Sequence, residues 1–288
     1  MTLSTSLPAD LPWGKHQALL LLDGATVSDL PQRLKQLSPG ATTVALYDCP
    51  SFTDLRDISP VLAAVQSIDE PLLQFYLQHA HEEWAVLLFS ADSVHTVAQH
   101  LRKLLTVELP EGLPVFLRLA DAAVARALFG SGDQRLFGPL AGVVTSDGVA
   151  ADWQYHQPRL AECPDLPTPY RLSAEQNSAL DQADQRRVLI ELDAHLLKHF
   201  PEFHRGATVA QRWPVLEQLG AESSSLGLNS QSELFYYANV VAWLNGSPLE
   251  QHPHLNRLLH TPSLQPIGER IALAADMAHD WANQRGRP

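Results

Sequence analysis

Histidines at ligand-like spacing are the residues of this chain that most directly suggest metal chemistry. His195 and His199 lie four residues apart in a predicted helix, so both imidazoles can face one ion, and His204 follows closely. The segment lacks the glutamate that a zinc protease motif places beside its first histidine. Packing beside a leucine stripe, near the helix end that favours positive charge, also explains the pair. We predict that no metal binds here.

Two further histidine groups allow the same two interpretations. The segment HAHEE contains His79 and His81, and the segment HPH contains His252 and His254. Alternating histidines can chelate a metal when they share one side of an extended strand. The first group, however, lies at a predicted helix end and the second surrounds a proline in a loop. We interpret both as solvent-facing residues, and the sequence predicts no cofactor.

Candidate nucleophiles lack the surroundings that catalysis needs. The chain has no G-x-S-x-G elbow, and Gly130-Ser131-Gly132 lacks the flanking strand and helix that such an elbow requires. Cys49 follows a predicted strand, but no histidine is near it in the sequence, and Pro50 removes the helix start that would activate a thiol. We interpret Cys49 as a structural thiol.

Asp23 and Asp48 each follow a predicted strand, where open α/β sheets hold metals or ribose groups. An α/β hydrolase that uses these carboxylates under a helical cap is therefore the alternative function. The loop after the first strand reads DGATVSD, which matches neither a phosphate-binding loop nor a dinucleotide fingerprint. The simpler interpretation is that each carboxylate binds nearby loop amides or caps the next element.

Arg118 interrupts an otherwise apolar strand, and a buried guanidinium needs a negatively charged partner. Asp121 follows it closely, and Asp23 and Asp48 are further candidates. An internal ion pair with one of these is favoured over recognition of a ligand carboxylate, because nothing else in the sequence describes a pocket.

Short apolar runs alternate with amphipathic segments through the first half of the chain. Continuous runs of this kind are typical of strands covered on both faces, so we expect a mixed or largely parallel sheet flanked by helices. Helices are expected around Leu30 to Leu37 and Val94 to Leu105, the second with Asp92 as its N-cap. The expected strands are 18–22, 44–47, 61–65, 85–89, 106–109, 115–119, 142–145 and 151–156.

A proline-rich segment, PRLAECPDLPTPYRL, separates this part from the rest. Its prolines remove backbone donors and forbid a continuing helix or inner strand. Strand-like runs disappear after it, and Ser173 with Gln176 makes a capping-box pattern that opens a helix. We therefore predict an α/β domain at 1–157, a linker at 158–172 and an all-helical domain at 173–288.

Two apolar stripes support a helical second domain, because each needs a packing partner. Ser230 with Glu233 opens a further helix, which Asn245-Gly246 ends. The first stripe is Leu189, Leu192, Leu196 and Phe200, and the second is Ile267, Ile271, Ala274, Ala278 and Trp281.

The composition excludes several classes of function. Hydrophobic residues make up 45% of the 288 residues and charged residues 18%, which is typical of a globular protein. The net charge of -12 repels phosphate backbones, so nucleic acid is not an expected partner. Two cysteines suit a reducing compartment. Neither a signal peptide nor a membrane span is expected, and we predict a cytoplasmic protein.

Seven short segments occur in a characteristic order: LLLLDGA, LYDCP, DISPVL, WAVLLFS, HLRKLL, FLRLAD and LFGP. Over roughly residues 17 to 146 this order resembles the adaptor chaperones encoded beside VgrG spike proteins in bacterial type VI secretion. Where that family shows F-R-F-Y-D-P, this chain has LRLADA, without the aromatics and the proline. The matching residues are Asp23, Gly24, Tyr47, Asp48, Pro60, Trp84, Leu101, Arg102, Arg118, Asp121, Phe137, Gly138 and Pro139.

The resemblance implies an α/β lobe followed by a helical lobe, and no catalysis. Such chaperones bind a cognate effector, often through its N-terminal region, keep it soluble, and help to load it onto a VgrG or PAAR-tipped spike. Aromatic residues dominate binding hot spots, so Phe235, Tyr236, Tyr237 and Trp243 are the candidate partner-binding residues. Their near-helical spacing also places some of them in a helix core. A scaffold unrelated to secretion is a third possibility.

Overall fold

The computed structural model describes residues 7–285, and the chain divides into two compact units. Unit 1 is Met1–Ala183 and unit 2 is Asp184–Pro288. Each unit has its own buried apolar core. The strands all belong to unit 1, and the described part of unit 2 is helical. The predicted fold class, an α/β domain followed by an all-α domain, is confirmed.

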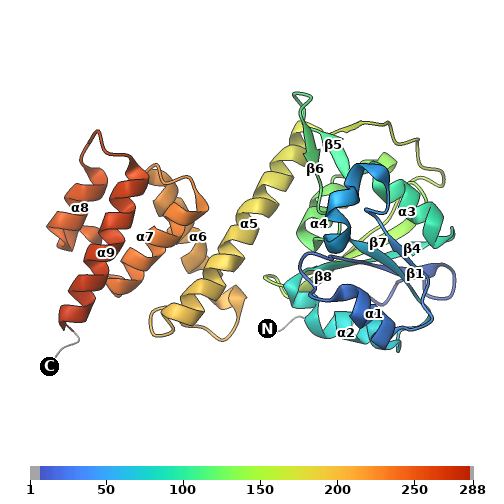
Figure 1. Ribbon diagram of the computed structural model, residues 1–288, viewed down its shortest axis with the longest axis horizontal. Helices are drawn as coiled ribbons and strands as arrows, with labels where there is room; N and C mark the ends of the chain where they lie inside the picture. The colour runs from blue at the N-terminus through green and yellow to red at the C-terminus, as the bar shows by residue number, and fades with distance from the viewer. Residues whose placement is uncertain (1–6, 286–288) are drawn as a thin grey trace. The chain divides into compact units, whose positions relative to one another are not determined.

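Six strands form the larger sheet of unit 1 (Figure 1). They are β1 (Gln17–Leu22), β2 (Thr43–Ala45), β3 (Val61–Val65), β4 (Ala85–Ser90), β7 (Leu140–Asp147) and β8 (Asp152–His156). Their order is β2-β3-β1-β4-β7-β8, and every neighbouring pair is antiparallel. The larger sheet is therefore antiparallel and not largely parallel.

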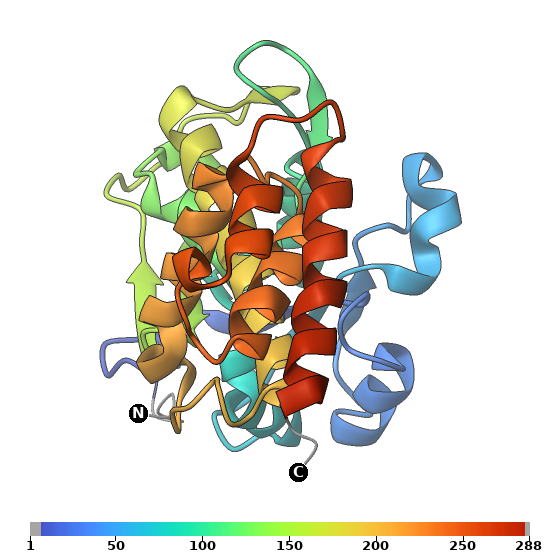
Figure 2. The same ribbon diagram turned by 90° about the vertical axis from the view of Figure 1, so that its left-hand side faces the viewer.

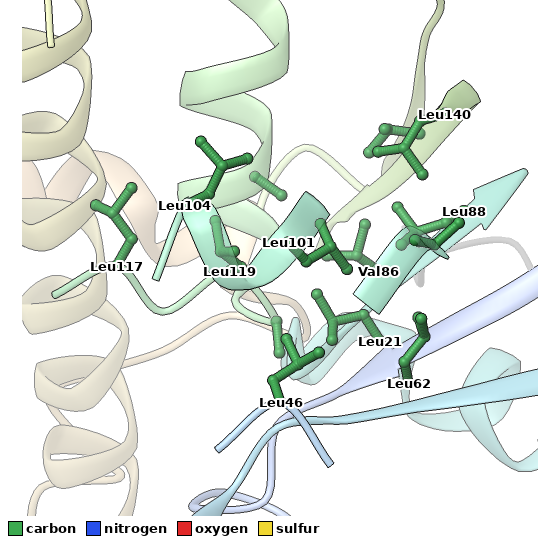
Figure 3. Packing of buried hydrophobic residues seen from close by; sticks show 14 of the residues in the cluster. Leu21, Leu46, Leu62, Val86, Leu88, Leu101, Leu104, Leu117, Leu119 and Leu140 are labelled. Atoms are coloured by element: carbon green, nitrogen blue, oxygen red, sulfur yellow. The ribbon is translucent and has the colours of Figure 1, made fainter. Parts of the chain in front are cut away.

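Helices cover both faces of this sheet, which explains why β1, β3 and β4 are almost entirely apolar. They are α1 (Leu30–Leu37), α2 (Pro71–His79), α3 (Val94–Lys103) and α4 (Ala122–Gly130). Leu20 and Leu22 of β1 join the core beneath α1 and α2, whereas Leu19 and Leu21 join the core beneath α3 and α4. Figure 3 shows Leu21 in this second core, among buried leucines from several elements. Two-sided burial was correctly indicated by the sequence, but it does not determine strand direction.

A smaller sheet completes unit 1. It consists of β5 (Thr106–Glu108), β6 (Pro114–Phe116) and β9 (Tyr170–Arg171), with β5 antiparallel to β6 and parallel to β9. β9 comes from the end of the proline-rich segment, and the fully buried Tyr170 lies in the core of unit 1. The division between the units consequently falls inside α5 (Ala174–His199), after the predicted start of the helical domain. That the chain consists of independently folding domains with a linker between them remains a prediction, with limits at 1–157, 158–172 and 173–288.

Unit 2 packs its helices around the two apolar stripes that the sequence indicates. Its elements are the later part of α5, α6 (Val209–Ser225), α7 (Gln231–Trp243), η4 (Leu249–Gln251), α8 (Pro253–His260) and α9 (Ile267–Arg285). Figure 2 shows α9, in red, beside the orange helices α7 and α8 that it contacts. Leu192, Leu196, Ile271, Ala274 and Ala278 are fully buried, which confirms both stripes.

Of the three helix caps that the sequence predicts, two are present. At α5, Ser173 Oγ accepts from the Gln176 amide at 3.2 Å and Gln176 Oε1 accepts from the Ser173 amide at 2.9 Å, which confirms this capping box. The capping box of Ser230 is also present at α7. The N-cap of α3 is Ser93, whose Oγ accepts from the Thr96 amide, so the prediction of Asp92 was wrong by one residue.

Candidate partner-binding surfaces

Arg118, in the loop after β6, forms an ion pair with Asp23 at the end of β1. The strand predicted at 115–119 ends at Phe116, so Arg118 does not lie within a strand. Arg118 Nη2 donates to Asp23 Oδ2 at 2.6 Å and to Thr26 Oγ1 at 3.2 Å. Asp23 Oδ1 accepts from the Ala25 amide at 2.8 Å, so the carboxylate also caps the turn after β1. The side chain of Asp23 is 7% exposed, whereas that of Arg118 is 45% exposed. The expected internal pair is present, but the guanidinium is half exposed rather than buried.

The other two acidic candidates have separate structural roles. Asp121 is the N-cap of α4, where Oδ1 accepts from the Ala123 amide at 2.9 Å. Asp48 lies at the surface, 3.3 Å from Arg56. Asp23 binds nearby loop amides, as the simpler interpretation expects. Asp48 instead pairs with the side chain of Arg56, so for this residue the expectation of loop amides or a cap was wrong.

A row of three aromatic rings, Tyr47, Phe52 and Phe116, begins beside the Arg118–Asp23 pair; we call it the unit 1 aromatic row. Phe52 comes from η1 (Pro50–Ile58) and stacks on Tyr47 with 4.9 Å between ring centroids, and Phe116 contacts Phe52 at 5.6 Å. Burial raises the pKa of Tyr47, and the charge of Asp23 raises it further. Phe116 is 68% exposed, so the row runs from the core to the surface.

More exposed apolar side chains come from the same elements. Leu55 and Ile58 of η1 are 39% and 44% exposed, and Leu113, before β6, is 60% exposed. Large exposed apolar side chains that gather on neighbouring elements are a feature of protein interaction sites. The sequence did not single out this surface, because the contact of Phe52 with Phe116 joins distant segments.

Arg102 and Trp84, two other residues of the family pattern, stabilise the sheet. Arg102 of α3 donates from Nε to the Leu46 carbonyl at 3.0 Å and from Nη2 to the Ala45 carbonyl at 2.8 Å, so it ties α3 to the edge at β2. The Trp84 ring is buried against Phe75 and Tyr76 of α2. These contacts give both side chains a structural role.

The family segment from Phe137 to Pro139 also has a structural role, as does the buried Pro60. The Pro139 carbonyl accepts from Ser90 Oγ at 2.7 Å. Gly138 has φ +48°, and a side chain there would overlap the ring of His100, which is held by the Leu136 carbonyl at 2.7 Å. Only glycine fits this approach without displacing the ring.

The four aromatic residues proposed for partner binding do not share one surface of unit 2. Tyr237 is buried and Tyr236 is 42% exposed, because they point to different sides of α7. Phe235 packs against His195 at 5.1 Å between ring centroids, and Trp243 packs against Phe200 at 5.0 Å. The structure therefore separates residues that are neighbours in the sequence.

Tyr237 lines a hollow of about 500 Å³ in unit 2, which we call the unit 2 hollow. The Tyr237 hydroxyl donates to Glu222 Oε2 at 2.7 Å, and both residues line the hollow. Glu250 and His260 also border it. The remaining lining residues are Phe203, Val215, Gln218, Leu219, Ser225, Leu226, Val241, Leu244, Gly246, Ser247, Pro248 and Leu249.

The histidines of α5 are held by protein groups. His195 Nε2 donates to Asn239 Oδ1 at 2.7 Å, and its ring lies 4.8 Å from that of His199. His204 instead donates from Nε2 to Asp193 Oδ1 at 2.7 Å. No cluster of three potential metal ligands occurs among residues 7–285. The buried pairing of His204 with Asp193 was not predicted from the sequence, because the two residues meet only through the loop after α5.

The other two histidine groups face solvent only in part: His81 and His254 are exposed, but the prediction was wrong for the half-buried His79 and His252. His79 lies near the end of α2, with Nδ1 2.8 Å from the Phe75 carbonyl, and His81 lies 4.0 Å from Glu82. His252 immediately precedes α8, and its ring packs 4.9 Å from that of Trp281. The HPH segment is thus a helix start rather than a loop.

Comparison with known proteins identifies the family. Residues 19–136 match a family model described as a domain of unknown function, DUF4123. The accessory protein VasW of Vibrio cholerae serotype O1 (strain ATCC 39315 / El Tor Inaba N16961) is 30% identical over 274 residues, which cover 92% of this chain and 88% of VasW. The chain belongs to the DUF4123 family of type VI secretion adaptors. The match to VasW extends through both units, beyond the DUF4123 region itself.

The DUF4123 region coincides with the part of unit 1 that carries the Arg118–Asp23 pair and the unit 1 aromatic row. No solved structure matches this chain. Within residues 7–285, no helix has the length and apolar character that crossing a membrane requires.

Proposed function

We propose that this protein is a non-catalytic adaptor that binds a cognate type VI effector, keeps it soluble and helps to load it onto a VgrG or PAAR-tipped spike. The family assignment carries this proposal, because the similarity to VasW extends along 92% of the chain and includes both units. A protein of this family is expected to act by contact with other proteins.

The geometry around Asp23 favours binding over hydrolysis. A hydrolase of the alternative kind would need Asp23 available to a substrate, but its oxygens accept hydrogen bonds from Arg118, Ala25 and Thr26. The carboxylate is thereby engaged in holding the turn after β1. This arrangement supports a structural role for the strand-end carboxylate and a function outside the hydrolases.

The unit 1 aromatic row is the surface in the DUF4123 region that best suits a protein partner. Exposed aromatic residues and arginine are enriched at the centres of protein interfaces. Phe116 supplies an exposed ring at the end of β6, and the half-exposed Arg118 follows two residues later. We propose that the effector contacts Phe116 together with the exposed side chains of η1.

We further propose that the adaptor acts in the cytoplasm, where an effector must stay soluble before it is loaded. Fractionation of the native host would test this location. An adaptor found mainly outside the cytoplasm would contradict it.

Co-expression tests the binding proposal. The effector encoded beside this gene would be produced alone and with the full-length adaptor, and the soluble fractions would be analysed by size-exclusion chromatography. We expect more soluble effector in the presence of the adaptor, and co-elution of the two chains. An effector that is equally soluble alone and elutes separately would reject the proposal.

A further inference from the structure

The unit 2 hollow combines an apolar wall with acidic groups. Leu219 of α6, Val241 of α7 and Leu249 of η4 contribute to its lining. Glu222 and Glu250 also lie along it. Among the described lining residues, none is lysine or arginine, and His260 is the one basic side chain. The hollow is therefore lined by apolar side chains and carries negative charge.

One of these acidic groups is fixed in position. The Tyr237 hydroxyl donates to Glu222 Oε2 at 2.7 Å, and the Gln218 side chain donates to Glu222 Oε1 at 2.8 Å, so the carboxylate is held on the wall of the hollow. Burial raises the pKa of Tyr237, and the hydrogen bond to Glu222 and the charge of Glu250 raise it further. The phenol consequently stays a protonated donor, and both carboxylates act on the same space. Glu250 is exposed and stands at the rim.

We infer that the unit 2 hollow receives a large apolar side chain of the effector, whose neighbouring lysine or arginine pairs with Glu250 at the rim. This inference rests on the proposed function and names the chemistry of the bound segment. A segment with acidic residues in place of the basic one is disfavoured, because like charges across an interface oppose association.

The hollow has room for the anchor side chain and for residues beside it. Its volume of about 500 Å³ lies within the range of pockets that bind small molecules, roughly 300–1,000 Å³. Binding energy at protein interfaces concentrates where an anchor side chain fills such a pocket. The apolar lining buries the anchor side chain. The carboxylates favour a segment that carries a basic residue beside this anchor, and they help to orient it.

Two pairs of matched variants test the inference in the full-length chain. Val215→Arg obstructs the lining, and Leu273→Arg is its control on α9, since the two side chains are 40% and 45% exposed. Glu250→Lys reverses the charge at the rim, and Glu269→Lys makes the same change at an exposed position outside the hollow. The probe is the N-terminal region of the neighbouring effector, fused to a soluble carrier protein and titrated by calorimetry.

We expect Val215→Arg and Glu250→Lys each to weaken binding by about tenfold or more, and both controls to stay within about twofold of the unmodified chain. A basic residue of the effector changed to glutamate should restore binding to Glu250→Lys. If the unmodified chain binds and all four variants bind equally well, the inference is wrong while the proposed function stands. If the unmodified chain does not bind either this fusion or the full-length effector, both are rejected.

Discussion

Arg212 holds Asp193 through two hydrogen bonds inside unit 2, from Nε to Oδ1 at 2.7 Å and from Nη2 to Oδ2 at 2.6 Å. His204 donates to the same carboxylate, and all three residues are buried. Arg212 also donates from Nη1 to the Gly206 carbonyl at 2.7 Å. The network therefore fixes the loop between α5 and α6 against both helices.

Removal of Arg212 should leave the buried carboxylate of Asp193 without its arginine partner. We expect Arg212→Ala to lower the free energy of unfolding by about 3 to 5 kcal/mol, measured by urea denaturation. Arg205→Ala is the control, because its pair with Glu202 is fully at the surface and should contribute less than about 1 kcal/mol. Equal effects of the two substitutions would contradict the role given to this network.

The same network predicts a pH dependence. Burial raises the pKa of Asp193, but hydrogen bonds from Arg212 and His204 outweigh burial and lower the pKa to about 2, below the ordinary 3.8. The stabilisation is thus complete above the unfolded value of 3.8 and is lost as pH falls towards 2. The stability difference between the unmodified chain and Asp193→Asn should shrink by roughly 2 kcal/mol between about pH 6 and pH 2. A difference that does not change with pH would refute this assignment.

Much of the fold follows from local sequence patterns, whereas the contacts at the candidate surfaces do not. Apolar runs locate β1, β3 and β4, and capping boxes locate the starts of α5 and α7, because both signals act over a few residues. The choice of Asp23 as partner of Arg118 depends on the register of distant strands. The Asp193–His204–Arg212 network and the Phe52–Phe116 contact likewise depend on loop paths that no local pattern encodes.

Arg118 is expected to contribute less to the free energy of unfolding than a fully buried ion-pair partner would. Its guanidinium is half exposed, and Asp23 keeps its bonds to the Ala25 and Thr26 amides when Arg118 is removed. Arg118→Ala should therefore lower the free energy of unfolding by about 1 to 2 kcal/mol. Arg56→Ala, which removes an exposed pair with Asp48, should change it by less than about 0.5 kcal/mol. An unchanged melting temperature for Arg118→Ala, with selective loss of effector binding, would instead assign Arg118 to recognition.

Gly138 should tolerate no side chain. Gly138→Ala combines a left-handed backbone with overlap of the His100 ring, and we expect it to cost about 2 to 4 kcal/mol. Gly132→Ala is a matched control, because that glycine has φ +80° but open space around it, and the backbone alone should cost about 1 to 2 kcal/mol. Thermal denaturation would distinguish the two. A Gly138→Ala protein as stable as Gly132→Ala would show that the ring can move aside.

Phe116 should contribute to effector binding without contributing to folding. Its side chain is 68% exposed, so Phe116→Glu should leave the melting temperature nearly unchanged and weaken binding by about tenfold. Leu160→Glu, at a side chain that is 49% exposed in the proline-rich segment, is the control for an added surface charge. Binding that survives Phe116→Glu unchanged would remove the unit 1 aromatic row from the interface.

Effector delivery from a strain that lacks this gene tests the adaptor role most directly. The effector encoded beside the gene would be followed in the medium and in target cells, with the VgrG protein followed as a measure of general secretion. We expect effector delivery to be lost while VgrG is still secreted, and to return when the gene is supplied from a plasmid. Normal delivery of the effector from the deletion strain would contradict the adaptor function.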